Sequence, residues 1–62
     1  SELEEALFLA DKIYIMGGQP TQIVDIIDVD LPRPRNFEVT VSKEYLAYKE
    51  KAIHRLFESE EK

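Results

Sequence analysis

The sequence predicts a small α+β unit: a helix, an antiparallel β-hairpin, an extended proline-rich arm and a second helix. Three observations support this prediction. Apolar residues recur at helical spacing near both ends of the chain, β-branched residues flank a Gly-Gly turn, and two prolines separate the halves. The chain has 62 residues, enough for one domain. We divide it into a helix and hairpin over 1–31, a linker over 32–41 and a helix over 42–62.

Residues 1–12 have the pattern of a short helix. Ser1 and Glu4 have the spacing of a capping box, and the acidic first turn suits the positive end of the helix dipole. Four apolar residues fall on one face: Leu3, Ala6, Leu7 and Ala10. Phe8 and Leu9 lie outside that face, so we expect this helix to be covered on more than one side.

A β-hairpin is predicted for the next segment. Residues 13–16 are rich in β-branched and aromatic types, and Gly17, Gly18 and Pro20 supply turn chemistry. Residues 21–31 are expected to form the second strand, because five positions out of seven are β-branched aliphatics: Ile23, Val24, Ile26, Ile27 and Val29.

A two-stranded hairpin is marginally stable in water unless another element covers it. Two interpretations follow. Either the two helices of the chain cover the hairpin, or the remaining apolar residues pack on a body outside these 62 residues. The residues left over for such a body are Phe8, Leu9, Tyr14 and Met16.

Residues 32–41 are predicted to be an extended connector. Pro32 and Pro34 remove backbone donors and favour extended geometry in the residues before them. Residues 37–41 alternate apolar and polar side chains, which suits a short edge strand or an extended arm. Ser42 is a suitable N-cap for the last helix. That helix has a wide apolar stripe made of Tyr45, Leu46, Tyr48, Ala52, Ile53, Leu56 and Phe57.

Composition excludes several classes of function. Eight Lys and Arg against 13 Asp and Glu give a net charge of −5, so we expect no nucleic-acid partner, because non-specific binding to phosphates needs positive charge. The chain has no cysteine, which favours a reducing compartment. Its longest apolar run, residues 6–10, is far shorter than the ~20 residues of a membrane-spanning helix, and no secretory signal is visible.

Three aspartates, Asp25, Asp28 and Asp30, raise the question of a calcium site. Strand alternation would place Asp25 on the face opposite the other two, and no glycine-centred loop surrounds them. We therefore expect solvated strand carboxylates and no metal. A calcium-binding protein would be stabilised by millimolar calcium, which is a direct way to test this expectation.

Neither the histidine nor the two arginines of the arm define an active site. His54 is flanked at helical spacing by Glu50 and Glu58, which is typical of a surface histidine between carboxylates and a poor basis for a zinc site. Arg33 and Arg35 leave two interpretations open: a fork for a phosphate or carboxylate, or a charged linker that blocks edge pairing.

Residues 5–16 resemble the segment that follows the switch histidine in the ATPase subunits of ABC transporters. In that family a His-Asp-x-x-Glu-Ala-x-x-Leu-Ala-Asp-Arg-Ile/Val pattern precedes a strand. The matching residues here are Glu5, Ala6, Leu9, Ala10, Asp11 and Ile13. Lys12 stands where arginine is usual and keeps the charge.

Two further segments are similar to the nitrate/sulfonate/taurine importer branch of that family. Residues 19–23 correspond to an Arg-Pro-Gly-x-Ile element, with Gln19 and Thr21 in place of the usual arginine and glycine. Residues 29–35 correspond to the branch's Val-x-Leu-Pro-Arg-Pro-Arg element, and residues 42–58 take the place of its C-terminal helix.

The resemblance implies that the chain is the C-terminal end of a P-loop α/β ATPase domain, with the hairpin at the edge of its sheet. The parent would use ATP and Mg to drive small-anion import through permease subunits, as a cytoplasmic protein peripheral to the inner membrane. Ser1 falls at the switch-histidine position, but a hydroxyl cannot replace an imidazole there.

The 62 residues include no Walker A, signature or Walker B motif. The chain by itself is therefore expected not to be an enzyme and to contribute no catalytic, cofactor-binding or metal-binding residue. Its expected partner is the remainder of the ATPase domain. The alternative is an autonomous interaction or regulatory module that self-associates as a homodimer.

Overall fold

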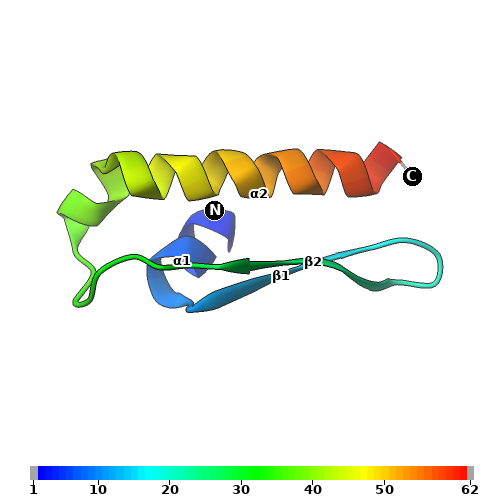
Figure 1. Ribbon diagram of the computed structural model, residues 1–62, viewed down its shortest axis with the longest axis horizontal. Coiled ribbons are helices and arrows are strands. Elements are labelled where there is room, and N and C mark those ends of the chain that lie inside the picture. The colour runs from blue at the N-terminus through cyan, green and yellow to red at the C-terminus, as the bar shows by residue number, and fades with distance from the viewer. Residues whose placement is uncertain (1, 62) are drawn as a thin grey trace.

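The computed structural model describes residues 2–61 and has the predicted α+β class. Its elements are helix α1 (Glu2–Leu9), strand β1 (Lys12–Gly17), strand β2 (Gln22–Asp28), the 3-10 helix η1 (Phe37–Val41) and helix α2 (Lys43–Glu61). Helix α2 runs along the hairpin, and α1 lies near the end of the hairpin opposite its turn (Figure 1). None of the helices within residues 2–61 is long and apolar enough to cross a membrane.

The first helix ends earlier than the sequence predicts. Helix α1 stops at Leu9, and Lys12, which was expected to be helical, is the first residue of β1 and pairs with Asp28. The reason is the hydrogen bond that the Val29 amide donates to the Asp11 carbonyl at 2.8 Å. Because this carbonyl is used by the neighbouring strand segment, the chain turns into the sheet at residue 11.

The two strands form an antiparallel hairpin with one irregularity. Ile15 pairs with Asp25 and Met16 pairs with Ile23, so Val24 is an extra residue on β2. Such a bulge bends the strand and increases its twist. Strand β2 ends at Asp28, three residues before the predicted end, although residues 29–31 continue beside the sheet.

The connector before α2 is not extended along its whole length. The expectation of an edge strand or extended arm over 37–41 is wrong, because these residues form η1. The Asn36 side chain accepts a hydrogen bond from the Glu38 amide at 3.1 Å, and the Thr40 hydroxyl donates to the Phe37 carbonyl at 2.6 Å. These short-range bonds satisfy the backbone locally, so the segment needs no neighbouring strand.

Ser42 caps α2, which begins at Lys43, as predicted. Its hydroxyl accepts a hydrogen bond from the Tyr45 amide at 3.1 Å and donates to the Val39 carbonyl at 2.7 Å. The serine therefore caps α2 and fixes η1 to its first turn.

One small core lies between the inner face of the hairpin, α1 and α2. Among the residues whose burial the structure describes, seven are buried there: Leu7, Ile15, Ile27, Val29, Leu31, Tyr45 and Ala52. Ala52 is fully buried and has a small side chain, which allows α2 to lie close to the sheet. The prediction that the chain's own helices cover the hairpin is therefore confirmed for its inner face.

Candidate functional site

Arg35 is the most heavily hydrogen-bonded side chain of the described residues. Its Nη1 donates at 2.7–3.2 Å to carbonyls at the end of α1, and its Nη2 donates at 3.3–3.4 Å to carbonyls that follow β2. The acceptors are Leu7, Phe8 and Ala10 for Nη1, and Val29 and Leu31 for Nη2. Helix α1, which is described along its whole length, has no basic residue in its last turn. Arg35 supplies the missing positive charge at the negative end of the helix dipole.

Arg33 contacts the same end of α1. Its Nη2 donates to the Leu9 carbonyl at 2.8 Å and to Asp11 Oδ1 at 2.9 Å. Both arginines of the arm are thus occupied within the chain, chiefly by backbone carbonyls. Arg33 binds a carboxylate, as one of the two interpretations drawn from the sequence allowed, but the binding of backbone carbonyls by both arginines was in neither interpretation.

The contact between Asp11 and Arg33 makes the free energy of unfolding depend on pH in the acidic range. The hydrogen bond from Arg33 holds the pKa of the Asp11 carboxyl below its ordinary value. A group with a lowered folded-state pKa contributes fully above its unfolded pKa, and its contribution is lost as pH falls through the folded value. We expect the wild type to lose slightly more stability than Asp11→Asn as pH falls below about 4. Urea unfolding at a series of pH values would measure this, and parallel curves would contradict it.

The three aspartates do not come together. Asp28 pairs with Lys12 Nζ at 2.9 Å, and this hydrogen bond raises the pKa of Lys12. Asp25 Oδ2 lies 2.6 Å from Arg55 Nε, an ion pair without hydrogen-bond alignment. Asp30 is exposed beyond the end of β2. No cluster of metal-ligating side chains occurs within the part of the chain that the structure describes.

The other sequence candidates also remain isolated. His54 is exposed on α2, and its neighbour Glu58 contacts Arg55 Nη1 at 3.4 Å. Ser1, the residue at the switch-histidine position of the resemblance, lies outside the described residues. The described side chains therefore present no set of nucleophile, base and electrophile.

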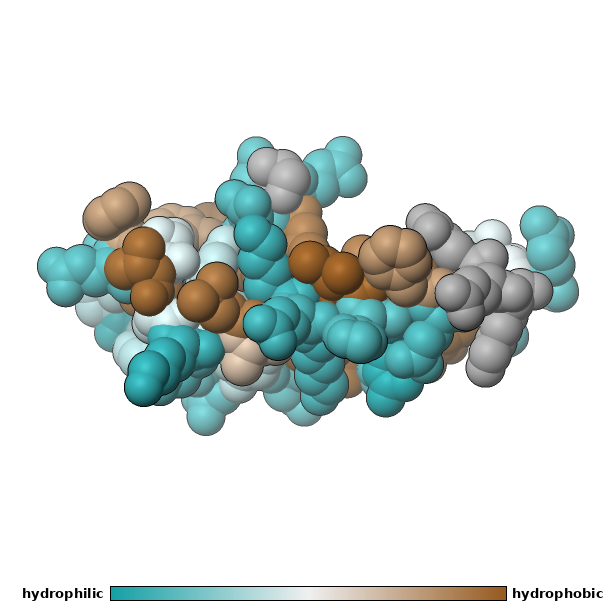
Figure 2. All heavy atoms as spheres, turned by 90° about the horizontal axis from the view of Figure 1, so that it is seen from above, coloured by the Kyte–Doolittle hydropathy of each residue, from teal (hydrophilic) through white to brown (hydrophobic). Residues whose placement is uncertain are grey.

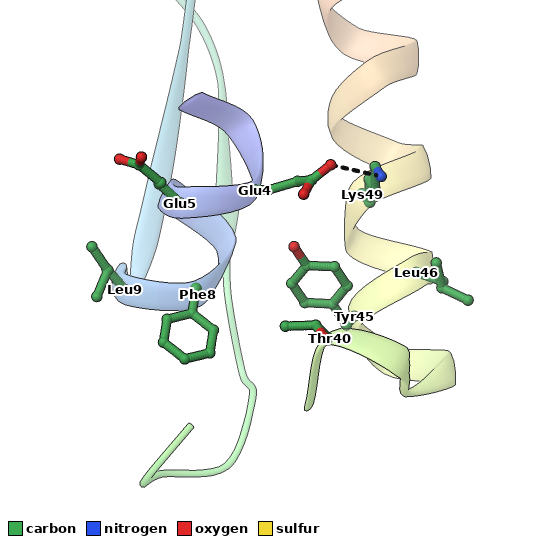
Figure 3. Close-up of a pocket in the computed structure, with 8 residues that line it drawn as sticks. All are labelled: Glu4, Glu5, Phe8, Leu9, Thr40, Tyr45, Leu46 and Lys49. Carbon is green, nitrogen blue, oxygen red and sulfur yellow. Dashed lines mark hydrogen bonds and ion pairs between the residues drawn. The ribbon is translucent and has the colours of Figure 1, made fainter. Parts of the chain in front are cut away.

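A groove of about 450 Å³ separates α1 from α2 and η1. Figure 3 shows Glu4 reaching across it from α1 to Lys49 on α2, where the two side chains form an ion pair at 3.2 Å. Its eight lining residues are Glu4, Glu5, Phe8, Leu9, Thr40, Tyr45, Leu46 and Lys49. The groove is amphipathic and open, and an exposed ion pair of this kind adds little to stability.

The face of the hairpin that points away from the core is apolar. Tyr14 pairs with Ile26, and Met16 pairs with Ile23, so the four side chains share one face. Their exposed fractions are 52%, 47%, 49% and 50%, respectively. We call this surface the outer hairpin face. Sequence reasoning identified Tyr14 and Met16 as unpartnered, but it missed Ile23 and Ile26, whose face depends on the bulge at Val24.

Comparison with known proteins gives a consistent set of relatives. The chain is 33% identical over 52 residues to an uncharacterized ABC transporter ATP-binding protein of Methanocaldococcus jannaschii, covering 84% of this chain and 18% of the relative. It is 33% identical over 63 residues to the nitrate transport protein NasD of Klebsiella oxytoca, and the match covers 98% of this chain and 24% of NasD. It is 40% identical over 35 residues to the aliphatic sulfonates import ATP-binding protein SsuB 1 of Xanthomonas axonopodis pv. citri, and the match covers 56% of this chain and 14% of that protein.

The chain spans at most about a quarter of the length of the curated relatives it matches. No family model matches it, and no solved structure matches it significantly. The relatives thus account for nearly all of this chain, while most of each relative lies beyond the matched region.

Proposed function

The chain matches a C-terminal segment of ABC transporter ATP-binding proteins, and on this premise we propose that it is the C-terminal structural part of the ATP-binding subunit of an importer for small anions. The whole subunit couples hydrolysis of ATP, with Mg, to transport through permease subunits. It lies in the cytoplasm, peripheral to the inner membrane. The names of the nitrate and sulfonate relatives support an anion of the nitrate/sulfonate/taurine type.

The outer hairpin face is the observation that carries this proposal. An antiparallel sheet with one solvated face normally alternates apolar and polar residues, with the polar side chains outward. Here both faces are apolar, and the chain's own helices cover only one of them. The remainder of the ATPase domain is the partner that the outer hairpin face fits. The role of these 62 residues is then that of a scaffold, in which no side chain makes or breaks a bond.

A second candidate is an autonomous module that self-associates. It is favoured by apolar side chains that are exposed on α2, among them Leu46, Ile53 and Phe57. Figure 2 shows apolar atoms between hydrophilic ones on the surface of the molecule. Sedimentation of the 62-residue chain at increasing concentration distinguishes the two candidates. A monomer argues against the self-associating module. A homodimer supports the module only if it packs through α2, because a dimer through the outer hairpin face is expected of a fragment that has lost its partner.

The full-length subunit tests the proposed function. The reading frame that contains this sequence is expected to encode a P-loop and a signature motif upstream, and its product to hydrolyse ATP. A frame that begins at or near Ser1 would contradict the proposal.

Oxidation of Met16, the one methionine in this sequence, tests the outer hairpin face separately. In the full-length subunit we expect peroxide to oxidise Met16 several-fold more slowly than in a synthetic peptide of residues 12–17, because neighbouring domain atoms cover its sulfur. Peptide mapping by mass spectrometry gives both rates. Equal rates would show that the face is open to solvent and would overturn its assigned role.

A further inference from the structure

A continuous run of hydrogen bonds joins the end of α1 to the middle of α2. Arg35 binds the last carbonyls of α1 on one side and the carbonyls of Val29 and Leu31 on the other. Between these two residues, the Asp30 amide donates to the Tyr48 hydroxyl at 3.1 Å. Tyr48 is half-buried on α2, so residues 29–31 are fixed from both helices.

We propose that Arg35 is a positioning residue that couples the orientation of α1 to that of α2 through residues 29–31. The guanidinium is a rigid planar fork, and it holds two sets of carbonyls at a fixed separation. A lysine at this position would be a single charged point and could not bond to both sets. A movement of the C-terminal end of α1 therefore moves residues 29–31 and changes the geometry of the hydrogen bond from the Asp30 amide to the Tyr48 hydroxyl.

The surroundings of Arg35 favour this role. Its Nε is buried and has no hydrogen-bond partner within residues 2–61, and the hydrogen bonds of its Nη atoms are part-buried. Hydrogen bonds in such a setting are stronger than bonds that water can replace. A direct polar link between α1 and α2 is the exposed Glu4–Lys49 ion pair, which is a weak constraint.

The coupling is reciprocal, as any equilibrium coupling between two sites must be. A change at Tyr48 must alter α1, and a change at Arg35 must alter α2. For ATP hydrolysis the inference rests on the proposed function, which places α1 and α2 in the same subunit as the nucleotide site. The coupling itself depends only on the contacts given above.

A double-mutant cycle in the full-length subunit tests the coupling, with Arg35→Lys and Tyr48→Phe as the two changes. Hydrogen exchange is followed at the Ala10 amide, which donates to the Ala6 carbonyl at 2.8 Å, and at amides of α2 around residue 48. Arg35→Lys is expected to speed exchange at Ala10 by about tenfold to a hundredfold, and Tyr48→Phe by about threefold. The double variant should exchange no faster than Arg35→Lys alone.

Arg55→Lys is the matched control, because Arg55 makes its ion pairs with Asp25 and Glu58, away from the end of α1. It is expected to leave exchange at Ala10 unchanged. If the Ala10 amide of the Tyr48→Phe variant exchanged at the wild-type rate, the coupling would be overturned. It would also be overturned if the rate increases of the two single variants multiplied in the double variant. Tyr48→Phe retains the ring and keeps the test valid if Arg35→Lys fails to fold.

Steady-state kinetics of ATP hydrolysis form the second readout. Arg35→Lys is expected to lower kcat several-fold and to leave KM for ATP unchanged, because it alters position and not nucleotide contacts. Equal changes in kcat for Arg35→Lys and Arg55→Lys would contradict a positioning role. A wild type that hydrolyses no ATP would refute the proposed function, and the exchange measurements would still decide the coupling.

Discussion

Replacing Leu7 with alanine is expected to lower the free energy of unfolding by about 2–5 kcal/mol. Leu7 and Ile27 are the largest fully buried side chains, and Leu7 is the one buried residue that α1 contributes to the core. Truncation removes buried apolar surface and leaves a cavity. A domain of this size has about 3–9 kcal/mol of total stability, so urea unfolding followed by circular dichroism should show a large shift of the midpoint.

Leu9→Ala is the matched control for this prediction. Leu9 lies on the same helix, but the residue is 66% exposed. The same chemical change is therefore expected to alter the free energy of unfolding by no more than about 0.5 kcal/mol. Equal losses for Leu7→Ala and Leu9→Ala would mean that the described burial of α1 is wrong.

Replacing Gly17 with alanine is expected to cost about 1–3 kcal/mol through overpacking. A Cβ built on Gly17 would lie 2.8 Å from Ser59 Cβ, at the point where the end of β1 meets α2. Ordinary carbon contacts are longer, so the helix or the strand would have to move. Thermal unfolding of Gly17→Ala should show a lower Tm than that of the wild type.

A second substitution separates this steric effect from a backbone effect. Ser59→Gly removes the clashing carbon, and the Gly17→Ala/Ser59→Gly double variant is expected to regain part of the lost stability. Gly18→Ala provides the contrast. The φ angle of Gly18 is +85°, and a Cβ added there would lie 3.5 Å from the Pro20 carbonyl oxygen, which is an ordinary contact distance. Its cost arises from left-handed backbone geometry, so Ser59→Gly should not relieve it.

Local signals explain which parts of the fold could be predicted. The two helices follow from spacing and from the Ser42 cap, and the hairpin follows from β-branched runs around Gly17 and Gly18. The segment 37–41 was misassigned because alternation suggested a strand. Asn36, a good capping residue just before it, was the signal for η1 that this interpretation did not use.

The candidate site could be predicted only in part, because its contacts are long-range. Arg33 and Arg35 were singled out from sequence, but their acceptors on α1 lie 24–28 residues away along the chain. Nothing in the spacing of the arm indicates that it folds back onto that helix end. The lack of a basic residue in the last turn of α1 was the one available hint.

The hydrogen-bond acceptors of Arg35 determine how the junction between α1 and the sheet responds to high ionic strength. Within residues 2–61, every hydrogen bond of its guanidinium goes to an uncharged backbone oxygen. Dissolved ions screen attraction between exposed charges such as Lys12 and Asp28 at distances set by the Debye length, which shrinks to about 3 Å in molar salt. They compete less with part-buried hydrogen bonds to uncharged oxygens. The junction between α1 and the sheet should therefore persist at salt concentrations that weaken the surface ion pairs.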